Sequence, residues 1–228
     1  RDLKPKAFLM ENVFGITYKG KDEAIDLLKR IINKINSEEG TNYNFNLGVI
    51  NAADFGVPQI RERVFIIGSR DGTDFKFPVP THKNPEDCDN DLFPLENWRT
   101  AWDAIGDLNS LNHPDIAATG KWADLLPSIP EGKNYLHHTN RGEGLPLFGW
   151  RTRYWSFLLK LAKDKPSWTI QAQPGSAIGP FHWKNRRLST RELCRLQTFP
   201  DEYEVLGGRT EIQRQLGNAV PSLIGEIL

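Results

Sequence analysis

Two stretches of the chain combine residue types that could carry out acid–base chemistry and bind a polar or negatively charged ligand. Glu11 follows a short apolar run, and Gln59, Arg61 and Arg63 stand two residues apart before another. Because alternate residues of an extended backbone point to one side, these three donors are predicted to share a face. Guanidinium groups suit carboxylates, phosphates and base edges, so the row predicts recognition of one ligand. A solvated basic loop is the alternative that these residues alone leave open.

The elements that must position these side chains follow an α/β pattern. Residues 21–38 repeat apolar side chains at helical spacing, and Gly40 is a natural helix stop. Three apolar runs are typical of buried strands: 7–10, 45–50 and 64–68. This order predicts the second half of an α/β domain. Ligands bind beyond the carboxyl ends of strands in open α/β sheets, and Glu11 is expected at such an end, with an ordinary exposed Glu as the alternative.

Composition limits the class of protein. The 228 residues include 29 basic and 29 acidic side chains, so no global charge indicates a nucleic-acid or membrane partner. With two cysteines and no long apolar run or signal-peptide pattern, we predict a reduced, cytoplasmic protein without a membrane partner. The first residue is Arg rather than Met, which indicates a piece of a longer protein.

Prolines, glycines and broken periodicity dominate from residue 78 to about 183, which predicts an irregular region. Short helices are expected at 98–105 and 154–161. Basic and aromatic residues interleave over 133–155, where four basic residues oppose one acidic residue for a net charge of +3. Arginines on such loops can reach phosphates and base edges, and a solvated basic face is the competing interpretation. The candidates for DNA contact are Arg141, Arg151 and Arg153.

The histidines and cysteines predict neither a metal site nor a nucleophile. His137 and His138 lack ligand-spaced partners and are expected to form a polar surface pair. Cys88 stands between two aspartates, which disfavours the thiolate, and Cys194 is expected to be buried inside a helix.

The last quarter of the sequence shows the clearest helix signals. Ser189 and Glu192 form a capping box. A second helix is predicted to start at Thr210 with Gly217 at its C′ position, and Pro221 is placed to open a terminal helix. Asn218 then falls in a turn, where its amide could bind a small polar ligand or only shape the turn.

Four motifs together resemble the last four strongly marked motifs of DNA (cytosine-5) methyltransferases, in their order and spacing. They are Glu11-Asn12-Val13, Gln59-x-Arg61-x-Arg63, the block 187–200, and the run 215–221. The resemblance implies the second half of a Rossmann-like methyltransferase domain over 1–77 and a target-recognition domain over 78–183. Residues 184–228 are then expected to end the recognition domain and return to the cofactor side of the first.

The resemblance also implies a reaction and roles for these residues. Members of the family flip a cytosine out of duplex DNA, add a cysteine thiolate to C6, and transfer a methyl group from S-adenosylmethionine to C5. Glu11 would hold the N3 and N4 edge of the base, Arg63 its O2 edge, and Arg61 would order the loop or meet phosphate. Asn218 and Ala219 would close one side of the cofactor pocket.

Two family motifs have no counterpart in these residues: the glycine-rich cofactor loop and the Pro-Cys-Gln nucleophile loop, both upstream of the Glu-Asn-Val motif. We therefore expect a carboxyl-terminal part of a bacterial modification enzyme that is inactive alone. Its expected partners are double-stranded DNA and the upstream half of the enzyme, whether covalent or a separate subunit. A catalytically silent DNA-binding relic and an RNA (tRNA) cytosine-5 methyltransferase are the alternatives.

Overall fold

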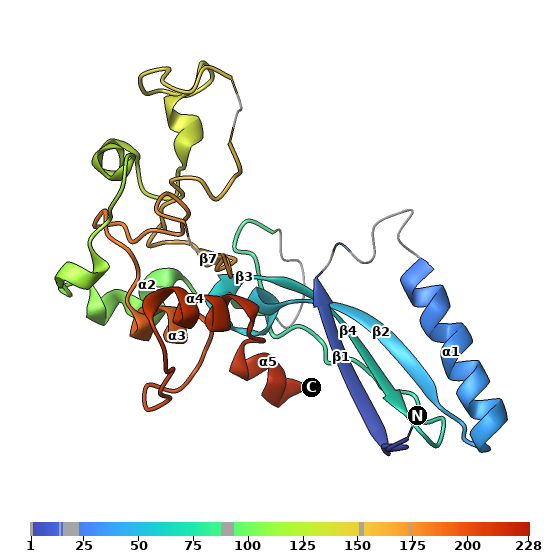
Figure 1. Ribbon diagram of the computed structural model, residues 1–228. Coiled ribbons are helices and arrows are strands. Elements are labelled where there is room, and N and C mark those ends of the chain that lie inside the picture. Colours follow the sequence, from blue (N-terminus) through green and yellow to red (C-terminus); the bar gives the residue numbers. More distant parts are fainter. Residues whose placement is uncertain (1, 14, 16–22, 88–93, 151–152, 174) are drawn as a thin grey trace. The chain divides into compact units, whose positions relative to one another are not determined.

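The computed structural model describes residues 2–13, 15, 23–87, 94–150, 153–173 and 175–228 (Figure 1). The chain divides into two compact units. Unit 1 comprises residues 1–51 and 61–79 together with Leu228, and unit 2 comprises residues 52–60 and 80–227.

Unit 1 combines a sheet with one long helix. Among the described residues, β1 (Ala7–Val13) and β2 (Asn44–Asn51) both pair antiparallel with β4 (Glu62–Ser69), which lies between them (Figure 1). The two outer strands therefore run in the same direction, with α1 (Glu23–Glu39) between them in the chain. An apolar hollow of about 260 Å³ is lined by side chains of α1, β1 and neighbouring residues, which include Phe8, Met10, Leu28, Ile31 and Tyr43.

The strands and the helix predicted for unit 1 are present, with one shift that concerns the site. The helix ends at Glu39, and Gly40 has the left-handed φ of 63° that ends helices at a glycine. β1 continues beyond the predicted run, because its residues up to Val13 pair with β4 as far as Arg63. Glu11 therefore lies inside β1 rather than after its end, which corrects the prediction.

Unit 2 is irregular and is built from short elements. Its described helices are α2 (Ala101–Ile105), α3 (Thr190–Leu196), α4 (Arg209–Asn218) and α5 (Ser222–Ile227). Its paired strands are β3 (Gln59–Ile60) with β7 (Ser167–Trp168), and β5 (His82–Lys83) with β6 (Glu96–Asn97). Short 3₁₀ helices occupy Ala52–Phe55, Gly106–Leu108, Pro114–Ile116, Ala123–Ser128 and Tyr135–His138.

Two apolar clusters form the interior of unit 2. One cluster joins α2, α3 and α4 through side chains such as Ile105, Leu193 and Leu216. The other is rich in aromatic rings, and Tyr135, Phe148 and Phe157 pack edge to face with centroids 5.6–5.7 Å apart. The irregular segments therefore pack on defined cores.

Local capping explains the helices that the sequence predicts correctly. In α3 the Ser189 hydroxyl accepts from the Glu192 N–H and the Glu192 carboxylate accepts from the Ser189 N–H. Thr100 and Asp103 form the same reciprocal pair at α2. α5 begins directly after Pro221, as predicted.

Two helix predictions are wrong. Residues 154–161 are not helical, because Leu158 has a φ of 53° and its N–H donates to the Ala177 oxygen over 2.8 Å. In α4 the N-cap is Gly208 rather than Thr210, and Gly217 lies inside the helix rather than beyond it. A Cβ on Gly217 would lie 2.5 Å from the backbone of Ala172, so this glycine permits a close approach instead of a turn.

Candidate active site

Glu11 and Arg63 form an ion pair on one face of the unit 1 sheet. Glu11 lies opposite Phe65, so Arg63, two residues before Phe65, is its diagonal neighbour on β4. Arg63 Nε lies 2.9 Å from Glu11 Oε1, and the two side chains are 14% and 25% exposed. Arg63 Nη1 also donates to the Glu62 backbone oxygen over 2.7 Å. The carboxylate is thus fixed in direction yet still open to a ligand.

Arg61 brings a second guanidinium to the same part of unit 1. It is only 1% exposed, and its backbone N–H donates to Asn51 Oδ1 over 3.2 Å. Burial lowers the pKa of Arg61 to about 10; the charge of Arg63 acts in the same direction and that of Glu11 against it. Two guanidinium groups thus lie close to a single carboxylate in this cluster. Such a cluster favours a ligand on which negative charge develops.

Gln59 does not join the two arginines. Its side chain is fully buried in unit 2, where Nε2 donates to the Leu196 oxygen over 3.1 Å and Oε1 accepts from the Ile170 N–H over 3.2 Å. The prediction of a single row of ligand donors is therefore wrong for this residue, because both ends of its amide bind the protein itself.

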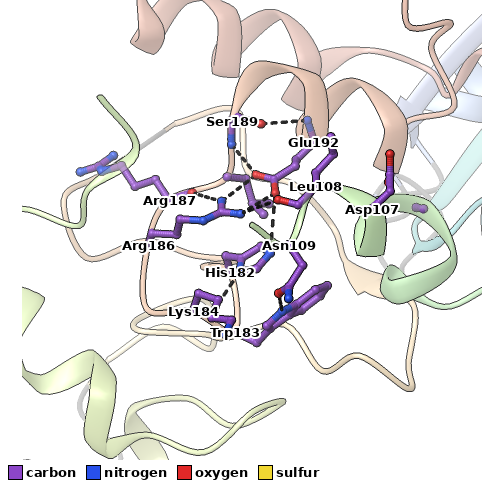
Figure 2. Close-up of polar contacts among 12 residues, drawn as sticks. Asp107, Leu108, Asn109, His182, Trp183, Lys184, Arg186, Arg187, Ser189 and Glu192 are labelled. Atoms are coloured by element: carbon purple, nitrogen blue, oxygen red, sulfur yellow. Dashed lines mark hydrogen bonds and ion pairs between the residues drawn. The ribbon is translucent and has the colours of Figure 1, made fainter. Parts of the chain in front are cut away.

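The last quarter of the chain contains a buried ion pair between Arg186 and Glu192 (Figure 2). Arg186 donates from Nη1 to Glu192 Oε2 over 2.8 Å and from Nη2 to Oε1 over 2.7 Å. Glu192 is fully buried and also accepts from the Ser189 N–H over 2.8 Å, so one carboxylate closes the capping box and neutralises the arginine. The capping box was readable in the sequence, but the partnership with Arg186 was not.

His182 lies against this pair. Its Nε2 is 3.6 Å from Glu192 Oε1, and its Nδ1 accepts from the Lys184 N–H over 3.0 Å. Burial, reinforced by the charge of Arg186, lowers the pKa of His182 to about 4. The ring is therefore neutral near pH 7 and, because Nδ1 accepts, carries its proton on Nε2.

Asn218 and Ala219, the predicted cofactor residues, close α4 in unit 2. The Ala219 N–H donates to the Leu216 oxygen over 3.3 Å, and Gln213 Nε2 donates to the Gln171 oxygen over 3.3 Å. The Asn218 side chain is exposed and makes no hydrogen bond to any described residue. Its amide is thus available to a polar ligand. Glu11, Arg61 and Arg63 belong to the other unit.

The predicted DNA-contacting arginines lie in unit 2. The guanidinium carbon of Arg141 is 3.8 Å from the ring centroid of Trp150, and that of Arg153 is 5.6 Å from the ring centroid of Phe157. Both arginines are exposed. Arg151 lies outside the described residues.

The remaining titratable candidates are structural. Cys194 is 3% exposed and burial raises the pKa of its thiol, which disfavours a nucleophile; Cys88 lies outside the described residues. His138 is buried, with Nε2 2.8 Å from Ser128 Oγ and Nδ1 3.2 Å from the Leu145 oxygen. The expected surface pair of histidines is therefore wrong for His138, which binds its own loop.

No group of three or more His, Cys, Asp or Glu side chains is arranged in the described part of the chain to hold a metal ion. None of the described helices is both long and apolar enough to cross a membrane.

The fold is a mixed α/β fold with methyltransferases as its structural neighbours. A candidate DNA modification methyltransferase from an Escherichia coli prophage matches with a TM-score of 0.62 at 20% identity, over 99% of this chain and 68% of that structure. The Dnmt2 methyltransferase of S. pombe matches with a TM-score of 0.52 at 13% identity, over 98% of this chain and 64% of that structure.

Sequence similarity identifies the family of the chain. Residues 1–228 match the model of C-5 cytosine-specific DNA methylases, and the chain belongs to this family. It is 40% identical over 242 residues to the Type II methyltransferase M.SacI of Streptomyces achromogenes, a match that covers 100% of this chain and 60% of that protein. It is 38% identical over 225 residues to the Type II methyltransferase M.NgoFVII of Neisseria gonorrhoeae, with 96% and 56% covered. The chain thus spans more than half, and less than two thirds, of these relatives.

Proposed function

We propose that this chain is the carboxyl-terminal part of a DNA cytosine-5 methyltransferase of a bacterial restriction–modification system. The whole enzyme transfers a methyl group from S-adenosylmethionine to C5 of a cytosine flipped out of a specific duplex sequence. The observation that carries the proposal is the ion pair of Glu11 with Arg63, beside the buried Arg61, on a sheet whose sequence matches this family.

The ion pair suits the polar edge of a flipped cytosine. When a thiolate adds to C6, negative charge spreads over the ring toward N3 and O2. Glu11 holds the N3 and N4 edge and carries the proton that N3 takes up, while Arg63 binds O2. None of the described contacts uses Arg63 Nη2, which leaves this donor for the base. Donors aimed at developing charge each contribute on the order of 3 kcal/mol in a water-excluded site.

The residues assigned to the cofactor fit a partial site. Asn218 presents a free-standing amide at the end of α4, and Ala219 follows it without a bulky side chain. S-adenosylmethionine supplies the methyl group when bound. The glycine-rich loop and the nucleophilic cysteine come from the upstream half of the enzyme in this proposal, so the chain alone is inactive. Residues 78–183 form the target-recognition region, with Arg141, Arg151 and Arg153 toward DNA.

The test is transfer of a labelled methyl group from S-adenosylmethionine to duplex DNA. The chain is assayed alone and again with a separately expressed upstream half that carries both missing motifs. We expect transfer in the mixture only, and loss of transfer with Glu11→Ala or Arg63→Ala. Glu62→Ala is the matched control, because this exposed carboxylate neighbours Arg63 on β4 and has no role in the proposal.

Each other outcome contradicts a stated part of the proposal. Transfer by the chain alone would mean that a resident cysteine is the nucleophile. No transfer by a mixture whose halves are folded and bound to each other would favour a silent DNA-binding relic. Transfer to a tRNA in preference to duplex DNA would identify an RNA methyltransferase.

A further inference from the structure

We infer that Arg141, positioned over the ring of Trp150, reads a guanine in the target duplex. The inference rests on the proposed function and deepens it, because it assigns sequence selection to one pair of side chains. Trp150 acts as a platform that positions the guanidinium, and Arg141 is the group that touches the base.

The Trp150 ring supports the guanidinium of Arg141 from one side. The Arg141 guanidinium carbon lies over this ring, 3.8 Å from its centroid, which is cation–π contact distance. Trp150 is 56% exposed, and no described carboxylate pairs with Arg141. The N–H donors lie in the plane of the group, so stacking leaves them free for a planar partner.

The loop that presents the stack is closely built. The Asn140 N–H donates to the Gly149 oxygen over 2.7 Å, and the Gly144 N–H donates to the His137 oxygen over 2.8 Å. A Cβ on Gly142 would lie 2.1 Å from the His137 oxygen, and Gly149 has a φ of 56°. The loop backbone therefore requires glycine beside Arg141 and next to Trp150, and the hydrogen bond from Asn140 to Gly149 brings these two positions together.

The surroundings favour a base edge over a phosphate. A hollow of about 490 Å³ is lined by Leu136, Thr139, Arg141 and Trp150. Leu145 and Leu147, on the same loop, are 70% and 54% exposed. Apolar side chains contact bases and thymine methyl groups, whereas phosphate contacts use mainly charged and polar groups. Guanine is the base that offers two adjacent acceptors, O6 and N7, to one guanidinium.

The experiment uses the chain with its upstream half and a library of duplexes in which the positions around a fixed cytosine are randomised. Sequencing after bisulfite treatment gives the methylation rate for each base at each position. Arg141→Lys keeps the charge but loses the planar fork, and we expect the preference for guanine at one position to fall by roughly 10- to 100-fold. Trp150→Leu keeps an apolar side chain but removes the platform, and we expect a smaller fall at that same position.

Lys121→Gln is the control, because it removes one positive charge from another exposed cation–ring pair of unit 2, Lys121 on Trp122 at 4.9 Å. It should leave every base preference unchanged. Replacing the selected guanine by 7-deazaguanine should slow the wild type to the rate of Arg141→Lys, because the N7 acceptor is missing. A uniform fall in rate for all sequences with Arg141→Lys would show a phosphate contact and overturn the inference. A wild type that methylates no duplex would instead refute the proposed function itself.

Discussion

The pair of Arg186 and Glu192 places two opposite charges in the interior, with the arginine 7% exposed and the carboxylate fully buried. The pair is bidentate, and the remaining capacity of the carboxylate is used by the Ser189 N–H. A buried ion pair is no guarantee of net stability, but the loss of one partner leaves the other charge uncompensated. The stability of the start of α3 therefore depends on this ion pair as well as on the capping hydrogen bonds.

Glu192→Gln tests this dependence. The amide keeps one acceptor for the Ser189 N–H but leaves Arg186 buried without a counter-charge, so we expect the free energy of unfolding to fall by about 3 kcal/mol. Urea denaturation followed by circular dichroism measures the change. Arg191→Gln, which removes an exposed arginine from Asp201 on the same helix, is the control and should have a much smaller effect. Equal losses in the two variants would contradict the role of burial.

His182 makes stability depend on pH. Its pKa is lowered from 6.5 to about 4 in the folded protein, so between these values the unfolded chain binds the proton that the folded chain excludes. Stability is therefore lost as the pH falls from about 6.5 to about 4, by at most about 3 kcal/mol. His182→Asn can still accept from the Lys184 N–H but does not titrate. The difference in unfolding free energy between wild type and variant should change across this pH window, and a constant difference would refute the assignment.

At the scale of the element, the packing of α4 depends on the absence of a side chain at Gly217. Gly217→Ala would place a methyl group 2.5 Å from the Ala172 backbone, so the segment must shift, and we expect a loss of about 1–3 kcal/mol. Gly225→Ala in α5 is the matched control, because nothing lies within 4 Å of its Cβ position. There the better helix former should stabilise by up to about 1 kcal/mol. A comparison of urea midpoints at unchanged slope separates the two results.

Elements that depend on interactions between neighbouring residues could be predicted from the sequence. Elements that depend on residues far away in the chain could not. The capping box at Ser189 and the helical apolar spacing that stops at Gly40 depend only on residues a few positions apart. The apolar run at 154–161 is also typical of a helix, but it forms turns and isolated bridges because Ala177 and other remote residues supply its hydrogen bonds. Gln59 was placed in the right motif, but the use of its amide depends on Ile170 and Leu196, more than a hundred residues away.

The candidate site, too, could be predicted only in part from the sequence. Glu11, Arg61 and Arg63 could be named from residue types and spacing, and the β1–β4 register explains why Glu11 meets Arg63. The contact of Arg141 with Trp150 could not be foreseen, because eight residues of irregular backbone separate them and the closure of their loop brings them together.

At the scale of the whole molecule, unit 1 exposes a group of large apolar side chains. Large apolar side chains of α1, β1 and β2 are more than a third exposed, among them Leu9, Met10, Leu27, Ile31 and Val49. If the upstream half covers them, its addition should lower the fluorescence of a dye that binds exposed apolar surface, by more than dilution explains. Leu9→Asp, on β1, should weaken association of the halves. Unchanged dye binding on complex formation would contradict this prediction.

The ten-residue connection between β2 and β4 has a consequence for exchanging unit 2 between relatives. Residues 52–60 belong to unit 2 although they interrupt unit 1, and in unit 2 β3 pairs with β7 while Gln59 binds Leu196 and Ile170. A chimera that imports residues 80–227 alone would separate these partners. A chimera that imports residues 52–60 together with 80–227 takes the β3–β7 pair and the partners of Gln59 from the same parent. The segments of unit 2 are thus discontinuous in the gene, and a crossover between residues 60 and 80 would divide them between two parental sequences.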